Sequence, residues 1–228
     1  WAIEDVIQRA RRNGIGFAGI TNSSHVGVLG IHLLPVAAAG MVGVAFTNSP
    51  AAIPAWGGKR ALFGTNPVAF AFPRKSGDPL VIDMGTSAFM GTDLQFRERL
   101  GTPIPEGVAL DPDGNPTTDA KAALTGSLNA IGGAKGAALA LMVEVLAVAL
   151  TGARFGFEAS SFFDADGPPP GVGQFLIVID PGAFGGADVF ADRIVALAGM
   201  IEGDGDARLP GARRIALRAK AEREGVTV

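Results

Sequence analysis

The sequence predicts an α/β fold, and three observations support this class. Helical and strand-like segments alternate at the start of the chain, with helical spacing of apolar residues in 2–13 and 28–40 and strand-like runs in 15–21 and 41–49. Polar residues gather where these strands end. The composition, 48% hydrophobic and 18% charged, is typical of a chain that buries a large core.

Glycine and proline set the limits of the first two helical segments. Asn13-Gly14 is a common helix stop, and Gly40 closes the second segment. Pro35 is expected to shorten or kink that second helix because it lacks a backbone N–H.

The rest of the chain continues the same mixture of elements. The sequence predicts a hairpin of 67–73 with 79–85, a helix within 86–101, irregular surface at 103–119, a buried helix after Lys135, an interior strand at 173–180, and helices at 187–201 and 213–224. A loop at 158–171 is long enough to be a lid or an excursion at the sheet edge.

Charge and composition exclude several classes of protein. The net charge of −3 comes without a basic stripe, so we expect no nucleic-acid partner. The most apolar stretch, 137–150, contains Glu144 and is shorter than the roughly 20 residues that cross a bilayer, so we expect a soluble, cytoplasmic protein without membrane contact. Without cysteine there is no thiolate chemistry, and with two histidines we expect no dedicated metal site.

The stretch NSSHVG, residues 22–27, holds the first histidine among small residues. His25 could transfer protons near neutral pH, although an isolated loop histidine is more often a surface or structural residue. The second histidine, His32, lies in an apolar segment and is interpreted as a packing residue.

Two glycine-rich patterns resemble nucleotide motifs without matching them. HVGVLGIH is close to a dinucleotide fingerprint, but a chain with 33 glycines produces this spacing by chance. GGAKGA (132–137) lacks the glycine before the lysine and the hydroxyl residue after it that a phosphate loop needs. Lys135 still lies at a helix start, where it would favour a substrate carboxylate or a cofactor phosphate; a solvated lysine is the equal alternative.

Two further stretches are candidates for ligand contact. WGGKRALFGTNP (56–67) lets the backbone approach a ligand, with Trp56 as a possible wall, although it could also be a simple connection. IDMGTS (82–87) follows a strand, where backbone amides often meet phosphates, but Asp83 could equally be a cap.

These stretches together resemble the malate/L-lactate dehydrogenase family, which is structurally distinct from the Rossmann lactate and malate dehydrogenases. The family includes ureidoglycolate, sulfolactate and diketogulonate enzymes and a cyclic-imine reductase. The segments that carry the resemblance, in the family's order, are NSSHVGVLG, MVGVAFTNSPAAIPAWGGKRALFGTNPVAFAFP, PLVIDMGTS, IPEGVALDPDGNPTTD, GGAKGAALALMVEVLAVALTGA, FLIVIDP and LPGARR.

The resemblance implies a mixed-sheet, non-Rossmann NAD(P)-binding fold and a reaction. Hydride would move between NAD or NADP and C2 of a 2-hydroxy or 2-oxo acid, with His25 as the proton donor or acceptor. The implied substrate-binding residues are His25, Val26, Gly27, Val28 and Leu29. The implied cofactor-binding residues are Ser49, Asp83, Met84, Gly85 and Lys135, with Asp180 and Pro181 as a weaker match.

The resemblance also implies an organisation and leaves alternatives open. The family region is 1–228, with about 40–175 as the cofactor subdomain, and family members work as homodimers. The family's N-terminal helical segment, which carries a Ser-His pair and an arginine for substrate, is absent from this chain. Either the sequence is a fragment of a longer chain, or the protein has lost the segment and with it the activity. In the second case the alternative is a catalytically silent nucleotide-binding or assembly subunit; a Schiff-base lyase using Lys135 is weaker. The region 89–101 departs from the family pattern, so the choice between NAD and NADP stays open. The choice among malate, lactate and ureidoglycolate as substrate also stays open.

Overall fold

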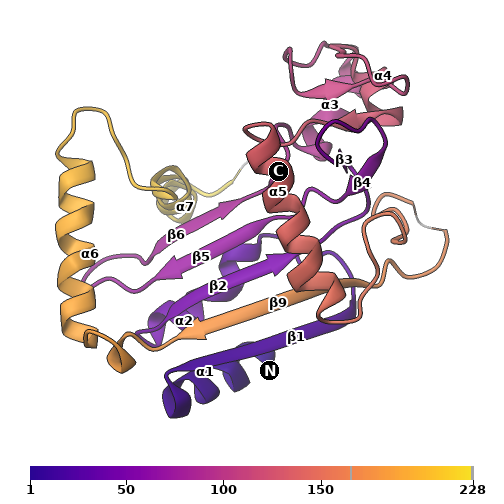
Figure 1. The fold of residues 1–228 in the computed structure, drawn as a ribbon. Helices are drawn as coiled ribbons and strands as arrows, with labels where there is room; N and C mark the ends of the chain where they lie inside the picture. The colour runs from indigo at the N-terminus through magenta and orange to yellow at the C-terminus, as the bar shows by residue number, and fades with distance from the viewer. Residues whose placement is uncertain (165, 227–228) are drawn as a thin grey trace.

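The computed structural model describes residues 1–164 and 166–226 (Figure 1). The strands are β1 (Ile15–Ser23), β2 (Val42–Thr47), β3 (Ile53–Pro54), β4 (Ala61–Phe63), β5 (Val68–Phe72), β6 (Leu80–Met84), β7 (Ala109–Leu110), β8 (Ser127–Leu128) and β9 (Val172–Ile179). The α-helices are α1 (Ala2–Asn13), α2 (Leu34–Ala38), α3 (Gly91–Leu100), α4 (Ala120–Thr125), α5 (Ala134–Val143), α6 (Ala187–Glu202) and α7 (Ala212–Glu224). Two 3-10 helices, η1 (Leu29–Leu33) and η3 (Pro181–Ala183), and a π-helix, η2 (Glu144–Ala149), complete the chain.

A five-stranded sheet in the order β1-β9-β2-β5-β6 forms the centre of the molecule. Each of its four pairings is antiparallel, whereas the resemblance implies a mixed sheet. The reason is that β9 enters between β1 and β2. These two strands run in the same direction and would form a parallel pair if they were neighbours. The α/β fold of the family is otherwise as predicted.

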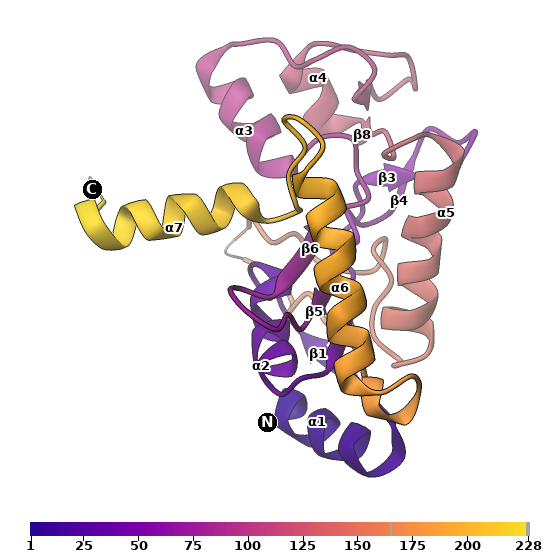
Figure 2. The ribbon, with the colours of Figure 1, turned by 90° about the vertical axis from the view of Figure 1, so that its left-hand side faces the viewer.

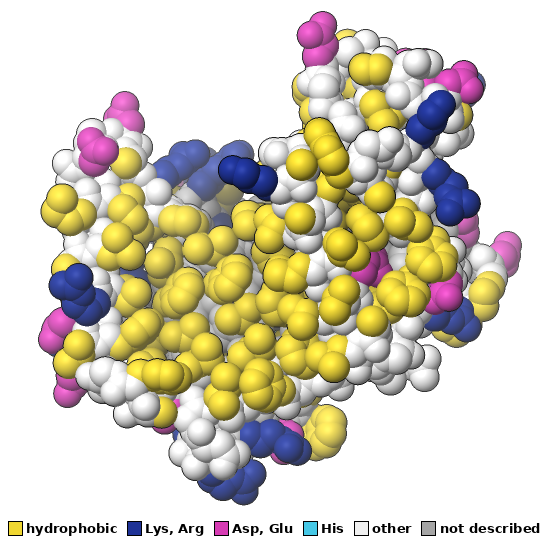
Figure 3. Space-filling model, viewed as in Figure 1, with side chains coloured by type: hydrophobic (Ala, Val, Ile, Leu, Met, Phe, Trp, Pro, Cys, Tyr) yellow, Lys and Arg dark blue, Asp and Glu magenta, His cyan; other side chains and the backbone are white. Residues whose placement is uncertain are grey.

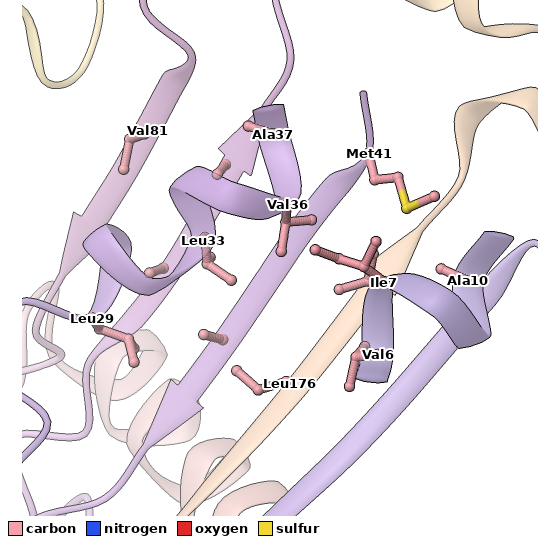
Figure 4. Packing of buried hydrophobic residues seen from close by; sticks show 14 residues of the cluster. Val6, Ile7, Ala10, Leu29, Leu33, Val36, Ala37, Met41, Val81 and Leu176 are labelled. Atoms are coloured by element: carbon pink, nitrogen blue, oxygen red, sulfur yellow. The ribbon is translucent and has the colours of Figure 1, made fainter. Parts of the chain in front are cut away.

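Helices cover the two faces of this sheet unequally. Helices α1, η1 and α2 pack on one face, and their apolar side chains form the main core with Val81, Leu176 and Val178 (Figures 2 and 4). On the other face, α5 and η2 bury Val143 and Ala147 against β2 and β5. The outer side of α5 stays exposed, so the predicted burial of this helix is right for its inner side and wrong for its outer side. Beside α5, apolar side chains of the open sheet face are visible at the surface (Figure 3).

Local sequence signals explain several of the boundaries. Gly14 ends α1 with a φ of 78°, a conformation that glycine adopts without steric cost. Pro35 lies in the first turn of α2, so the predicted second helix is split into η1 and α2. The predicted hairpin is confirmed by the pairing of β5 with β6. Helix α4 was not predicted, although Asp119 caps it by accepting a hydrogen bond from Lys121 N at 2.9 Å.

The chain between β6 and α5 forms a separate small core. Leu94 and Ile104 pack there with residues of β7, α4 and β8, and this part lies beyond the end of the main sheet (Figure 1). The subdomain limits of about 40–175 stay a prediction. No helix in the described part of the chain is long and apolar enough to span a membrane.

The contact of α5 with the segment before it leads to a stability prediction. A Cβ at Gly136 would lie 1.8 Å from Ile131 O, whereas a Cβ at Gly199, inside α6, would meet open space. Gly136→Ala should therefore lower the free energy of unfolding by about 1–3 kcal/mol. Gly199→Ala, the matched control, should raise it by about 0.5–1 kcal/mol because alanine favours helices. Urea denaturation measures both, and equal effects of the two substitutions would contradict the close contact.

Candidate functional site

The register of the sheet brings the ends of several strands to one side. On β9, Val172 pairs with Ser23 of β1 and Gln174 pairs with Thr47 of β2. On β5, Val68 pairs with Phe46 of β2 on one side and with Met84 of β6 on the other. We call the segments 24–30, 48–51, 64–67 and 85–88, which continue from these strand ends, the strand-end edge. Most of the predicted site residues lie on it.

His25 lies on the first of these segments and is exposed to solvent. Its Nδ1 accepts a hydrogen bond from Gly27 N at 3.1 Å, so in the neutral ring the proton is on Nε2. The Nε2–H can therefore donate a hydrogen bond toward solvent or a ligand. Protonation of Nδ1 would break the hydrogen bond from Gly27 N. The edge of the Phe162 ring meets the His25 ring, with the centroids 5.3 Å apart. Phe162 belongs to the predicted 158–171 loop, of which Ala165 lies outside the described residues.

The rest of the segment turns from the end of β1 toward β6. Val28 is exposed, but the Leu29 side chain is 3% exposed and belongs to the main core, so it does not point toward a ligand. His32, interpreted as a packing residue, is exposed instead, and its Nε2 lies 2.8 Å from Val26 O. This contact holds the turn that carries His25.

Asp83 anchors the far end of that segment. Its Oδ2 accepts a hydrogen bond from Gly30 N at 2.7 Å, near the start of η1. Of the two roles predicted for Asp83, ligand contact or a cap, this oxygen therefore acts as a cap. The following residues, Met84 and Gly85, are exposed. A ligand can therefore reach the end of β6 at these two residues.

Ser49 lies at the centre of a hydrogen-bonded chain along the strand-end edge. Its Oγ accepts from Thr65 N at 3.0 Å and lies 3.3 Å from Thr65 Oγ1. Thr65 O in turn accepts from Thr86 N at 2.8 Å and from Thr86 Oγ1 at 3.0 Å. Thr86 O then accepts from Ile131 N at 2.8 Å, which ties the segment before α5 to the same edge.

Lys135 is exposed in the first turn of α5. Two glycines before it, Gly132 and Gly133, have φ values of 62° and 67°, which lets the chain turn sharply into the helix. Trp56 lies against Gly133 and lines a cavity of about 460 Å³ together with Gly57 and Asn129. Trp56, Gly57 and Gly58 therefore form one wall of this cavity, and contact of Trp56 with a ligand stays a prediction.

Asp180 and Pro181 lie at the opposite end of the sheet from Ser49. Asp180 N donates to Gly14 O, and its side chain caps η3 through Gly182 N at 2.8 Å. On β9, Gln174 pairs with Thr47, close to Ser49, whereas Ile179 directly precedes Asp180. These two positions of β9 are five residues apart, or about 17 Å along the strand. The structure thus does not bring Asp180 and Pro181 together with the other predicted cofactor residues.

The sequence interpretation missed a buried acid, Glu144, the first residue of η2. The side chain is 2% exposed, and its oxygens accept hydrogen bonds from Gly64 N (3.2 Å), Asn66 Nδ2 (3.0 Å) and Gly156 N (3.4 Å). Burial raises the pKa of the Glu144 carboxyl above its ordinary 4.5, although these three hydrogen bonds act in the opposite direction. A charged residue inside an apolar helical run was the available signal, since acids are rarely buried without partners.

No group of three His, Asp or Glu side chains among the described residues is arranged to hold a metal ion. The site thus offers a histidine, hydroxyl groups, exposed backbone and one lysine. These groups suit proton transfer and the binding of an anionic organic ligand.

Comparison with known proteins matches residues 1–228 to the family model described as malate/L-lactate dehydrogenase. The chain is 48% identical over 217 residues to a (2R)-3-sulfolactate dehydrogenase (NADP(+)) of Chromohalobacter salexigens, covering 95% of the chain and 64% of that protein. It is 44% identical to a Delta(1)-pyrroline-2-carboxylate/Delta(1)-piperideine-2-carboxylate reductase of Pseudomonas putida, over 100% of the chain and 67% of the reductase. The chain therefore spans about two thirds of the length of these relatives.

A solved structure gives the same likeness in three dimensions. The crystal structure of delta1-piperideine-2-carboxylate reductase from Pseudomonas syringae pvar. tomato superimposes with a TM-score of 0.92 at 39% identity. The match covers 100% of the chain and 68% of the reductase. Sequence and fold thus agree on one group of enzymes.

The raised pKa of Glu144 leads to a prediction about stability and pH. A carboxyl whose pKa is raised on folding stabilises the native state below its unfolded pKa, near 4.5, and this stability is lost as pH rises through the native pKa. Glu144→Gln cannot ionise. The free energy of unfolding of the wild type, minus that of Glu144→Gln, should thus fall as pH increases above about 4.5. Urea titrations between pH 4 and 8 measure this difference; a constant or rising difference would refute the assignment.

Proposed function

Because the chain belongs to the malate/L-lactate dehydrogenase family, we propose that it transfers hydride between NADH or NADPH and C2 of a small 2-oxo acid. In the reverse direction it would oxidise the corresponding 2-hydroxy acid. The observation that carries this proposal is that His25, Ser49 and Gly85 lie on one strand-end edge, with Asp83 and Met84 directly before it at the end of β6. The relatives' substrates, sulfolactate and cyclic imino carboxylates, add two classes to the candidates.

The groups on the strand-end edge, at the end of β6 and at the start of α5 fit a nicotinamide dinucleotide. Lys135 supplies a positive charge at the start of α5, where the helix also favours phosphate. Ser49, Met84 and Gly85 offer a hydroxyl and exposed backbone for the sugar and amide groups. When it is bound, the nicotinamide supplies or accepts the hydride. Asp180 and Pro181 are left out of this proposed set because of their distance from it.

His25 would handle the proton. As hydride reaches C2 of a 2-oxo acid, negative charge develops on the carbonyl oxygen, and a donor at that atom lowers the barrier. The Nε2–H of His25 is free to point at such an oxygen. To give up this proton the ring would be the imidazolium, with Nδ1 also protonated and the contact from Gly27 N to Nδ1 open, so that a neutral ring is left after the transfer. In the oxidative direction the neutral ring, with its proton on Nδ1, would accept the hydroxyl proton at Nε2.

We further propose a homodimer in the cytoplasm. Support comes from the open face of the sheet, where apolar side chains gather at the surface (Figure 3). Phe17, Phe175 and Leu150 line a hollow of about 580 Å³. Phe17 and Leu150 are at least half exposed, and α6 also carries exposed apolar side chains. Apolar area of this kind is typical of a surface that another subunit covers. A chain without cysteine is compatible with a reducing compartment.

Replacing His25 tests the proposed reaction. Oxidation of NADH and NADPH by the purified chain is followed with pyruvate, oxaloacetate, 3-sulfopyruvate and a cyclic imino carboxylate. His25→Asn should lower kcat by at least about 100-fold, because the proton donor is lost, with little change in nucleotide affinity. The exposed neighbour Ser24→Ala controls for disturbance of the turn. Full turnover in His25→Asn would remove His25 from the mechanism. Nucleotide binding without turnover in the wild type would favour the silent-subunit alternative.

Replacing Lys135 tests the proposed anion contact. Lys135→Ala should raise the Kd for NADPH or the KM for the acid about tenfold, since a charged contact is lost. Lys121→Ala is a matched control, because Lys121 is also an exposed lysine in the first turn of a helix, α4. Unchanged constants for both ligands in Lys135→Ala would exclude this role.

A further inference from the structure

Glu144 is a buried acid that the proposed chemistry does not use. The residue begins the π-helix η2, and Leu150 N closes the wide turn by donating to Val145 O at 3.0 Å. Segments of π-helix are rare and often occur near functional sites. A carboxyl group in this position is costly to bury, so its partners indicate what it holds together.

Those partners come from two separate loops. Gly64 N and Asn66 Nδ2 belong to the connection between β4 and β5, and Gly156 N belongs to the loop after η2. Asn66 has no solvent exposure, a φ of 37°, and a second hydrogen bond from Nδ2 to Ala140 O at 2.9 Å. The carboxyl group therefore fixes an unusual backbone conformation within the strand-end edge.

Close backbone packing makes this arrangement specific. A Cβ at Gly64 would lie 2.4 Å from Ser49 O, and a Cβ at Gly156 would lie 2.9 Å from Gly64 N. Gly156 O also accepts a hydrogen bond from Ala51 N at 2.9 Å. The loops of Ser49, Gly64 and Gly156 are thus stacked on each other, with the Glu144 carboxyl bridging two of them.

The fixed segment leads directly to Ser49. Thr65 stands between the two Glu144 partners Gly64 and Asn66, and its backbone N–H donates to Ser49 Oγ at 3.0 Å. A shift of the 64–66 backbone would therefore move the group that orients the Ser49 hydroxyl. The same shift would disturb Thr65 O, which accepts both hydrogen bonds from Thr86.

We propose that Glu144 is a positioning residue for the nucleotide site: its carboxyl holds residues 64–66 so that Thr65 orients the Ser49 hydroxyl toward the cofactor. This inference rests on the proposed function, because it assumes that Ser49 contacts the nucleotide. Glu144 itself touches neither cofactor nor substrate. Its effect passes through Gly64 and Asn66 to Thr65.

A double-mutant cycle on the purified chain tests the proposal. Kd values for NADPH are measured by fluorescence titration for the wild type, Glu144→Gln, Ser49→Ala and the double mutant. Glutamine keeps the shape but has one acceptor oxygen, so either Gly156 N or the Gly64 and Asn66 donors lose their partner. We expect Glu144→Gln to weaken binding about tenfold in the wild-type background and to change it less than about twofold when Ser49 is already alanine. Equal effects in both backgrounds would overturn the proposal.

Hydrogen exchange on the same proteins separates the proposal from its premise. In Glu144→Gln the amides of Gly64, Thr65 and Thr86 should exchange at least about tenfold faster, while those of central β9 should keep their rates. The matched control is Glu158→Gln, an exposed acid of the same loop as Gly156, and it should leave both Kd and exchange unchanged. Unchanged exchange in Glu144→Gln would overturn the positioning role. A wild-type chain that binds neither NADH nor NADPH would contradict the proposed function, and the nucleotide part of the inference with it. The exchange data would then still decide whether Glu144 holds residues 64–66.

Discussion

The insertion of β9 between β1 and β2 is the constraint on which the other features depend. This strand, at 172–179, pairs with residues that precede it by more than 120 positions, and its register aligns Ser23, Thr47 and Val68 at one end of the sheet. At this end of the sheet, the residues after Ser23, after Thr47 and before Val68 are mostly small or polar. Gly173 contributes directly, because a Cβ there would lie 1.9 Å from Ala147 O, so β9 and η2 can approach closely. The site segments are therefore assembled by long-range strand pairing, and no single segment forms the site alone.

Buried polar side chains then fix the geometry of that end. Asn48, 2% exposed, donates to Arg154 O at 2.9 Å and accepts from Gly173 N at 2.9 Å. Glu144 plays the same part on the other side of β2, where it joins the β4–β5 connection to the loop after η2. Each polar group costs free energy to bury and repays it only in one arrangement of its neighbours. This requirement gives loops without regular structure a defined shape, which a binding site needs.

The amino-acid sequence predicts local elements and some site residues, because these depend on short-range patterns. The Gly14 stop, the β5–β6 hairpin and the helices after residue 186 follow from periodicity and turn residues, and the motifs indicated the family. The sheet order could not be predicted, since it depends on β9 and on contacts far along the chain. For the same reason, the sequence alone could not show that Asp180 and Ser49 lie at opposite ends of the sheet. Glu144 was noticed only as an obstacle to a membrane span, because burial with partners is a property of the folded chain.

The most direct test of the account is a map of where nicotinamide nucleotide contacts the chain. The ¹⁵N-labelled protein is titrated with NADPH, and the shifts of its backbone amide resonances are followed by NMR. The account predicts that the largest shifts cluster on the strand-end edge and the start of α5, at Ser49, Thr65, Gly85 and Lys135. It also predicts that Asp180 and its neighbours, at the other end of β9, hardly move. Shifts concentrated around Asp180, or no shifts at saturating nucleotide, would contradict it.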